Sequence, residues 1–559
     1  MYDPSGRSNK IILVLLLVLV LISLIVPLEK SPETSETHHF HVNNNLQIAY
    51  TACEGTLYPD LCVATVSILP NLASRSLPDL ISAILNQTMD EVRLSCANCT
   101  EIEKGLKSNT TLEWAAINDC IELFNHTLAE LRVALAELNP KRVRFSRNYH
   151  KIKTFLSAAM TNQYTCLDGF HGSKGKTKYV IKEALHNISH HISNSLAMML
   201  NKFPGVNESK PVEVFPEYGR RRRYFPAWLS LKDRKLLQAP VDATEFDLIV
   251  ALDGSGNFTT IGDAVAAAPI HSYERFVIYI KAGAYLENIE VEMEKTMVMF
   301  VGDGIGKTVV KANRNVADGH TTFRSATVAV MGDGFIAKGI TFENSAGPSK
   351  NQAVALRSGS DLSAFYKCSF VAYQDTLYVH SLRQFYRECD IYGTVDCIFG
   401  NAAAVFQACS LYARKPNRDQ ENVFTAQGRA DPNQNTGISI LNCKIRAGSD
   451  LIPVISSFKT YLGRPWKEYS RTVIMRSYID DLVDTAGWLE WSGNFALNTL
   501  YYGEFLNRGP GSDTSRRVTW PGYRVITSFA DANQFTVGAF IQGNQWLNST
   551  DIPFNLGLR

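Results

Sequence analysis

Residues 365–370 read FYKCSF, and this pattern of a short strand interrupted by a cysteine returns three times further along the chain. The later copies are FYRECDI at 385–391, FQACSL at 406–411 and ILNCKI at 440–445. Their cysteines are separated by 21, 20 and 34 residues and are Cys368, Cys389, Cys409 and Cys443. A repeat of about 20 residues built of strands and turns predicts a right-handed parallel β-helix, with one coil per repeat. The longest step predicts a coil that carries a loop of about a dozen extra residues.

The same period places polar side chains together. Gln352 and Gln374 are 22 residues apart, and Asp375 and Asp396 are 21 apart. Equivalent positions on neighbouring coils stack about 4.8 Å from each other, so we expect the glutamines on adjacent coils and the aspartates beside them. Two carboxylates this close must share a proton or have a cationic partner. Such an arrangement favours a functional site over a decorative polar ladder.

The 559 residues are too many for one core and predict at least two folded units. Short apolar strands with Gly and Asn turns begin near Phe246, and we place the β-helical domain at 240–559. Residues 49–203 have a helical pattern instead, which predicts a four-helix bundle. Its clearest apolar stripe repeats at steps of four and three and consists of Ile117, Ile121, Phe124, Leu128, Leu131, Leu135 and Leu138.

The N-terminus predicts entry into the secretory pathway. An apolar run at 11–28 follows Arg7 and Lys10, which is typical of a signal peptide or a signal anchor within residues 1–28. A polar linker is expected at 29–48. Eight N-x-S/T sequons predict glycosylation, at Asn86, Asn98, Asn109, Asn125, Asn187, Asn207, Asn257 and Asn548. The eleven cysteines should largely pair in such a compartment, and the odd number leaves at least one thiol free.

The segment 204–239 loses all periodicity and is rich in proline and arginine. It contains the run Arg220–Arg223 and a second basic cluster at 232–237. An exposed basic linker between two domains is what a processing protease requires, although an ordinary solvated linker has the same composition. The net charge of +2 gives no reason to expect a nucleic-acid partner.

Several ordered blocks resemble the plant pectin methylesterase family. They are DGSGNF at 253–258, GAYLE at 283–287, QAVAL at 352–356, QDTL at 374–377, GTVDCIFG at 393–400 and LGRPW at 462–466. In the helical part, CEGTLYPDLC at 53–62 resembles the first disulfide hairpin of the plant invertase and pectin methylesterase inhibitor family. RKLL at 234–237 resembles the processing motif of two-domain precursors.

The first resemblance implies hydrolysis of methyl esters on galacturonate units of cell-wall pectin, with neither metal nor organic cofactor. It implies that Asp396 is the nucleophile, that Gln374 and Gln352 stabilise the oxyanion, and that Asp375 is the general acid and base. Arg464 would keep Asp396 ionised, and Trp466 and Thr322 would bind substrate. Tyr378 and Phe399 are either groove or core residues. We further expect a secreted monomer, whose precursor residues 11–28 could anchor in a membrane, with inhibitor proteins as additional partners.

Cysteine pairing is also implied by the resemblances, as Cys389–Cys409, Cys53–Cys62 and Cys120–Cys166; the pairing of Cys96 and Cys99 stays open. The chain departs from the family at Cys397, where phenylalanine is usual. Strand alternation predicts that Cys397 points into the core, next to the outward Asp396.

Rival functions remain at this stage. A polygalacturonase would also use paired aspartates, but with a Gly-His-Gly element that the chain lacks, and a lyase would need acidic calcium ligands. An inactive pectin-binding protein dominated by its inhibitor domain is the alternative from another class. The helical domain could also serve folding or targeting and inhibit nothing.

Overall fold

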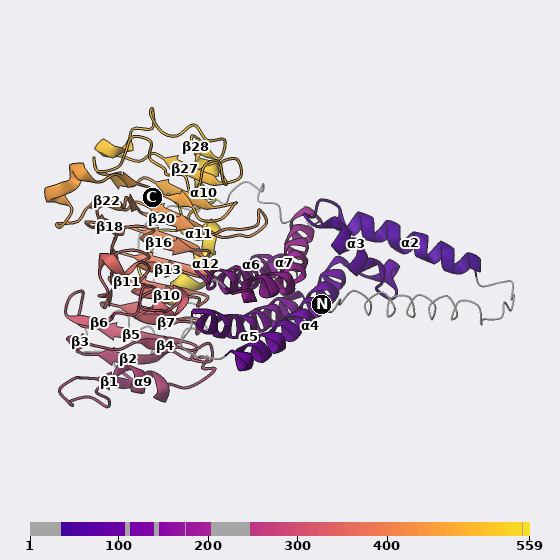
Figure 1. The fold of residues 1–559 in the computed structure, drawn as a ribbon, viewed down its shortest axis with the longest axis horizontal. Helices are drawn as coiled ribbons and strands as arrows, with labels where there is room; N and C mark the ends of the chain where they lie inside the picture. Colours follow the sequence, from indigo (N-terminus) through magenta and orange to yellow (C-terminus); the bar gives the residue numbers. More distant parts are fainter. Residues whose placement is uncertain are drawn as a thin grey trace, which may run out of the picture.

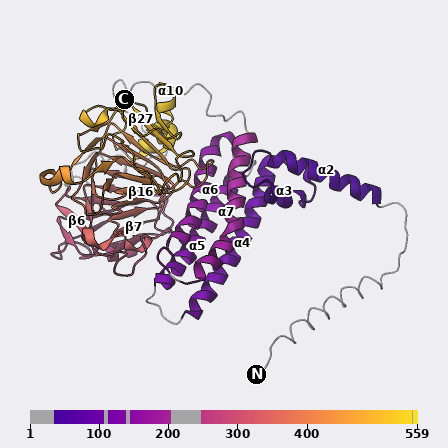
Figure 2. The ribbon, with the colours of Figure 1, turned by 45° about the horizontal axis from the view of Figure 1, so that its top comes forward.

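The computed structural model describes residues 35–106, 112–138, 145–173, 175–202, 246–550 and 552–558. The first part of the chain is helical and the second is built of short parallel strands, as predicted (Figure 1). Helices α5 and α6 lie against the β-helix, whereas α2 and α3 lie at the far end of the bundle, and Figure 2 shows the same arrangement from a second direction.

The bundle is a ring of four antiparallel helices preceded by two more. Within the ring α4 contacts α5 and α7, and α6 contacts the same two helices. Helix α4 begins with a capping box between Ser76 and Asp79. The six helices are α2 (Ser35–Cys53), α3 (Pro59–Ser67), α4 (Leu77–Gly105), α5 (Leu112–Leu138), α6 (Phe145–Asp168) and α7 (Thr177–Lys202).

Two predicted disulfides are confirmed in the bundle. Cys53–Cys62 joins the end of α2 to α3, and Cys120–Cys166 joins α5 to α6. Cys96 and Cys99 are free thiols on α4. Covalent links between neighbouring helices reduce the conformational entropy of the unfolded chain and so stabilise the bundle.

The predicted polar linker at 29–48 is wrong from Ser35 onward, because α2 is already helical there. Its polar residues form no apolar stripe, so periodicity could not reveal it. The helix is fixed at its C-terminal end, where Ala49 and Cys53 are buried against the bundle. The signal or anchor segment at 1–28 and the basic linker at 204–239 lie outside the described residues. In the described ranges, no helix is both long and apolar enough to cross a membrane.

The β-helix has three parallel sheets. The first, of eleven strands, contains β1 (Leu248–Val250), β2 (Phe276–Ile280), β5 (Val298–Gly302), β8 (Ile336–Lys338), β11 (Ser363–Tyr366), β14 (Arg383–Arg387), β17 (Ala403–Gln407), β21 (Gly437–Leu441), β25 (Arg471–Met475), β27 (Tyr501–Phe505) and β28 (Tyr523–Val525).

The second sheet, of eight strands, contains β3 (Gly283–Tyr285), β6 (Thr308–Ala312), β9 (Thr341–Asn344), β12 (Ser369–Val371), β15 (Asp390–Gly393), β18 (Ser410–Ala413), β22 (Lys444–Ala447) and β26 (Tyr478–Ile479). The third, of seven strands, is the one that faces the bundle. It contains β4 (Ile289–Val291), β7 (Val328–Val330), β10 (Leu356–Ser358), β13 (Leu377–Val379), β16 (Ile398–Gly400), β20 (Thr425–Gln427) and β24 (Arg464–Pro465).

Short elements complete the β-helix. The strands β19 (Asn422–Val423) and β23 (Thr460–Tyr461) pair with each other. Helix α9 (Ile261–Ala267) packs its buried side at the N-terminal end of the stack. The helices α10 (Phe529–Asn533), α11 (Val537–Ile541) and α12 (Gly543–Trp546) contribute to a separate apolar cluster on the outside of the eleven-stranded sheet.

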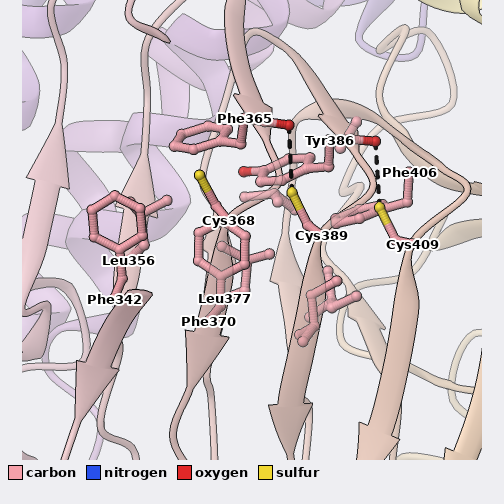
Figure 3. Close-up of a cluster of buried hydrophobic side chains, with 14 of the residues drawn as sticks. Phe342, Leu356, Phe365, Cys368, Phe370, Leu377, Tyr386, Cys389, Phe406 and Cys409 are labelled. Atoms are coloured by element: carbon pink, nitrogen blue, oxygen red, sulfur yellow. Dashed lines mark hydrogen bonds between the residues drawn. The ribbon is translucent and has the colours of Figure 1, made fainter. Parts of the chain in front are cut away.

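The cysteine ladder sets the register of the coils. Phe365 pairs with Tyr386, Tyr386 with Phe406, and Phe406 with Ile440, which keeps the four cysteines equivalent. The aromatic rings stack inside the β-helix at centroid distances of 4.8 and 4.5 Å, and Figure 3 shows them beside the cysteines. The interior of the coils is therefore a stacked aromatic and thiol core.

The predicted Cys389–Cys409 disulfide is wrong, because both thiols are free in the structure. The two residues do lie on neighbouring coils, before β15 and β18. Each Sγ instead contacts a backbone carbonyl of the preceding coil, Phe365 O for Cys389 and Tyr386 O for Cys409, both at 3.4 Å (Figure 3).

The long coil between Cys409 and Cys443 divides its extra residues between two loops. One loop lies between β18 and β19 at 414–421, and the other lies between β20 and β21 at 428–436. The second loop reaches the bundle: Asp431 accepts a hydrogen bond from Ser193 Oγ at 2.5 Å, and Gln434 Nε2 donates to Ser157 O at 2.9 Å. The insertion predicted from the repeat thus holds the two domains together.

Candidate active site

Asp375 and Asp396 precede strands β13 and β16 on neighbouring coils. Because Leu377 pairs with Ile398, the two aspartates are in register, as their spacing predicted. Both have left-handed backbone conformations, with φ of 63° and 51°. The same conformation recurs at other turns of the β-helix, such as Glu388, so it is a feature of how the coils turn. The turns thus present the two carboxylates together, and both are 94% buried.

Arg464 supplies the cation that such a pair needs. Its Nε donates to Asp396 Oδ1 at 2.7 Å and its Nη2 donates to Asp396 Oδ2 at 2.6 Å. The guanidinium also lies over the Trp491 ring, 4.3 Å from the centroid. A two-pronged contact of this kind fixes the orientation of the carboxylate as well as its charge.

The Asp375 carboxyl group has no hydrogen-bonding partner among the described residues, although the backbone N–H of Asp375 donates to Val395 O at 3.0 Å. Burial raises the pKa of its carboxyl well above 3.8; the neighbouring Asp396 raises it further and Arg464 only partly opposes this. The two carboxyl groups therefore differ in their surroundings, since Arg464 binds Asp396 by two hydrogen bonds whereas burial raises the pKa of Asp375. Such a division is how a pair of acids obtains separate roles.

Gln352, Gln374 and Thr322 line the same cavity as the two aspartates. The glutamines are not in register, however. Leu356 pairs with Leu377, so Gln374 lies opposite Ala353, one residue beyond Gln352. Their 22-residue spacing is one longer than the coil, which explains the offset. The cavity still brings both amide side chains to the carboxylate pair.

An aromatic wall borders the cavity. Tyr378 and Phe399 project from the outer face of β13 and β16 and stack at 4.2 Å, and Trp466 meets both rings edge-on at 6.5 and 5.9 Å. All three line the cavity, so Tyr378 and Phe399 are groove residues and do not belong to the interior of the coils. Such apolar ring faces are suited to binding a sugar.

Cys397 points into the core, as alternation predicted. It is 1% exposed and belongs to the interior cluster of the β-helix. Its Sγ lies so close to Gly393 that a Cβ on that glycine would be 2.5 Å from the sulfur. Burial raises the pKa of the thiol to about 12, which suppresses the reactive thiolate.

The bundle forms a roof over this site. A stripe of small polar residues runs along one face of α6 at helical spacing: Thr154, Ser157, Thr161, Thr165 and Asp168. Each contacts the catalytic domain through a hydrogen bond or ion pair. Toward the C-terminal end of the stripe, Thr165 Oγ1 lies 2.9 Å from His380 Nε2. His380 is fully buried, and burial holds its pKa well below 6.5.

Helix α5 adds contacts at one end of the roof. Asp119 accepts hydrogen bonds from Thr321 Oγ1 at 2.5 Å and from Arg324 Nε at 2.7 Å, and Glu122 also pairs with Arg324. The apolar core of the bundle continues into the outer face of the seven-stranded sheet through Ala329, Tyr378 and Ala426.

The bundle lies over the aspartate pair and leaves a space above it. A cavity of about 250 Å³ remains between the two domains. Leu112, Thr165, Asp168, Gly169 and His171 line it from the bundle side. Across the described ranges, no hydrogen bond joins the bundle to Gln374, Asp375 or Asp396. Contacts between the bundle and the catalytic domain lie on both sides of the cavity, at Arg324 and at Lys467.

Sequence patterns missed the docking residues. The α6 stripe could have been recognised, since its small polar residues recur at steps of three and four. It was not, because the face that a helix buries is usually identified by apolar residues at this spacing. Arg324, Lys467 and the loop 428–436 carry no such signal. Of the predicted glycosylation sites, the six that are described have exposed asparagines: Asn86, Asn98, Asn125, Asn187, Asn257 and Asn548. No group of His, Cys, Asp and Glu in the described residues could hold a metal ion.

Comparison with known proteins agrees with both domains. Residues 247–544 match the Pectinesterase family and residues 47–198 match the plant invertase/pectin methylesterase inhibitor family. The chain is 54% identical over 489 residues to the probable pectinesterase/pectinesterase inhibitor 39 of Arabidopsis thaliana, covering 87% of this chain and 91% of that protein. It is 46% identical to pectinesterase/pectinesterase inhibitor U1 of Solanum lycopersicum, covering 100% and 98%.

Among solved structures, the pectin methylesterase from carrot is 59% identical, with a TM-score of 0.56. The match covers 57% of this chain and 99% of the carrot chain. That carrot chain therefore corresponds to a single domain of this protein and shows that such a domain folds alone.

The β-helical fold and its carboxylate site, with these matches, define a carboxylic ester hydrolase. More particularly, the chain belongs to the plant pectinesterases that carry an inhibitor domain in front of the catalytic domain. Its activity is that of a pectin methylesterase, with pectin as substrate. Its disulfides are consistent with secretion to the cell wall.

Proposed function

We propose that the chain hydrolyses the methyl esters of galacturonate units through a covalent intermediate on Asp396. The observation that carries this proposal is the asymmetry of the aspartate pair. Arg464 holds Asp396 by two hydrogen bonds, whereas the Asp375 carboxyl group has a raised pKa and, among the described residues, no hydrogen-bonding partner. We therefore assign Asp396 as the nucleophile, oriented by Arg464, and Asp375 as the acid.

In the first step an Asp396 oxygen attacks the ester carbonyl, and the resulting oxyanion accepts hydrogen bonds from the amides of Gln374 and Gln352. Asp375 then donates its proton to the departing methanol. In the second step Asp375, now a carboxylate, takes a proton from water, which attacks the acyl group on Asp396. This returns both residues to their starting states and leaves a free uronate. Trp466 and Thr322 hold the sugar beside the pair.

Substitution of Asp396 tests this mechanism. Asp396→Asn fills the same space and keeps one acceptor for Arg464, but an amide cannot act as the nucleophile. We expect methanol release from methylated pectin by residues 240–559 to fall by at least about 1,000-fold, because residues of a covalent mechanism act as a unit. An unchanged melting temperature is the control for folding. Retention of one tenth of the parent activity would refute the assignment.

We also assign the bundle an autoinhibitory function. The contacts of α5 and α6 support this proposal, since they lie on both sides of the catalytic cavity. Cleavage in the basic linker, at Arg220–Arg223 or at 234–237, would release the bundle on the way to the cell wall. The test compares methanol release by an uncleavable full-length chain with that by residues 240–559. Equal specific activity would exclude inhibition and favour a role in folding or trafficking.

A further inference from the structure

Two cations of the catalytic domain lie at opposite ends of the roofed groove. Arg324 precedes strand β7, and Lys467 follows strand β24. Within the seven-stranded sheet, β7 lies two strands before β13, and β24 lies two strands after β16. With neighbouring strands about 4.8 Å apart, each cation is about 10 Å along the sheet from the aspartate pair. The two charges therefore flank the reacting centre nearly symmetrically.

Both cations lie beside walls of the catalytic cavity. The Arg324 guanidinium is 5.5 Å from the centroid of the Phe323 ring, and Lys467 Nζ is 4.9 Å from that of Trp466. Phe323 and Trp466 both line the cavity. A chain of sugars that crosses the aspartate pair along the sheet would consequently pass each cation.

The bundle satisfies these two cations with carboxylates. Asp119 and Glu122 pair with Arg324, and Asp168 Oδ1 lies 2.6 Å from Lys467 Nζ. Within the catalytic domain, Arg324 has one longer contact, to Glu290 at 3.8 Å. Lys467 has no acidic partner besides Asp168 in the described part of the chain; its neighbour Glu468 is exposed. Removal of the bundle thus leaves Lys467 without its acidic partner and Arg324 with only the longer contact to Glu290 among the described residues.

We propose that Arg324 and Lys467 bind free carboxylates of partly demethylated pectin on either side of the reacting ester. The inference rests on the esterase function proposed above. Pectin presents a neutral methyl ester or an anionic uronate at each unit, and only the uronate gains from a cation. The two residues therefore favour esters that lie near units already demethylated. The bundle acids occupy the same positions and imitate the polymer.

The test uses two pectins, one almost fully methylated and one about half demethylated, with residues 240–559 as enzyme. Lys467→Gln and Arg324→Gln each remove one charge. We expect the ratio of kcat/KM on the half-demethylated pectin to that on the methylated pectin to fall about fivefold for each, the upper range for a partly exposed ion pair. The double variant should fall about 25-fold, because the sites are too distant to couple.

Conservative and distant variants complete the design. Lys467→Arg and Arg324→Lys keep the charge and should restore the ratio to within about twofold of the parent. Lys444→Gln removes an exposed charge from the eight-stranded sheet and should leave the ratio unchanged. Raising the salt concentration should shrink the difference between parent and Gln variants.

Two outcomes would overturn the assignment: a ratio that does not change, or an equal loss on both pectins, which would indicate a role in general binding or stability. Absence of methanol release by the parent domain from either pectin would instead refute the esterase function itself.

Discussion

The ion pair between Asp168 and Lys467 offers a direct way to open the roof. Asp168→Lys changes only the bundle and places two positive charges where one pair now exists. At 4 Å and an effective dielectric constant of 20, like charges repel by about 4 kcal/mol. The side chains are 33% and 19% exposed, so we reduce this to about 1–2 kcal/mol and add about 1 kcal/mol for the lost attraction. Docking should weaken by about 2–3 kcal/mol.

The consequence for activity follows from tethering. A linker of this length gives an effective concentration near about 1 mM, and docking of about 1 μM affinity then leaves about 0.1% of the uncut chains open. A loss of about 2–3 kcal/mol raises the open fraction to about 3–14%. We therefore expect methanol release by the uncleavable chain to rise about 30- to 140-fold, and the effect to diminish at high salt.

Asp90→Lys is the matched control, since it makes the same charge change on the exposed surface of α4, where Asp90 pairs only with Arg93. It should leave the uncut chain as inactive as its parent. The reasoning would be refuted if Asp168→Lys, shown by circular dichroism to be folded, left activity unchanged, or if Asp90→Lys activated equally.

Three further predictions concern the roof and the site. Burial raises the pKa of Asp119 to about 6, against an unperturbed 3.8, although Arg324 opposes this shift. The contribution of Asp119 to docking is therefore complete below pH 3.8 and is lost as the pH rises through 6. The activity of the uncleavable chain relative to that of residues 240–559 should be lower at pH 5 than at pH 7.5, and an Asp119→Asn chain with the same pH profile would contradict this. Arg464→Lys keeps the charge but loses the two-pronged contact with Asp396, so kcat of residues 240–559 should fall at least about tenfold while the melting temperature stays within about 4 °C; full activity of this variant would remove Arg464 from the site. Cys397 should resist alkylation in the native enzyme, and Cys397→Phe should cost about 1–3 kcal/mol of stability beside Gly393 while the enzyme stays active; rapid labelling with loss of activity would show that the thiol is accessible.

Much of the catalytic site follows from the sequence because a parallel β-helix converts sequence spacing into spatial neighbours. The 21-residue interval was sufficient to place Asp375 beside Asp396, and alternation was sufficient to turn Cys397 inward. The one-residue excess between Gln352 and Gln374 was also visible, and the structure shows that it offsets the pair. In a repeat structure, residues about one coil apart in the sequence are direct neighbours in space, so their contacts can be predicted from the spacing.

The contacts made by side chains at equivalent positions of neighbouring coils were harder to predict than the positions themselves. Stacking of Cys389 on Cys409 was predicted, but the direction of each thiol depends on the turn that carries it, and both point to backbone carbonyls. The helical state of residues 35–48 was likewise hidden, because tertiary attachment at Cys53 and not an apolar stripe supports α2.

The sequence by itself determined the two domains, the β-helical coil length, the aspartate pair and the esterase family. Only the tertiary structure decided where the bundle lies, because docking depends on complementary charges and shapes from segments with no common period. The pairs Asp119–Arg324 and Asp168–Lys467 join residues separated by 205 and 299 positions. Such contacts have no sequence signature in a single chain, since neither partner is distinguishable from an ordinary surface charge until the two faces meet.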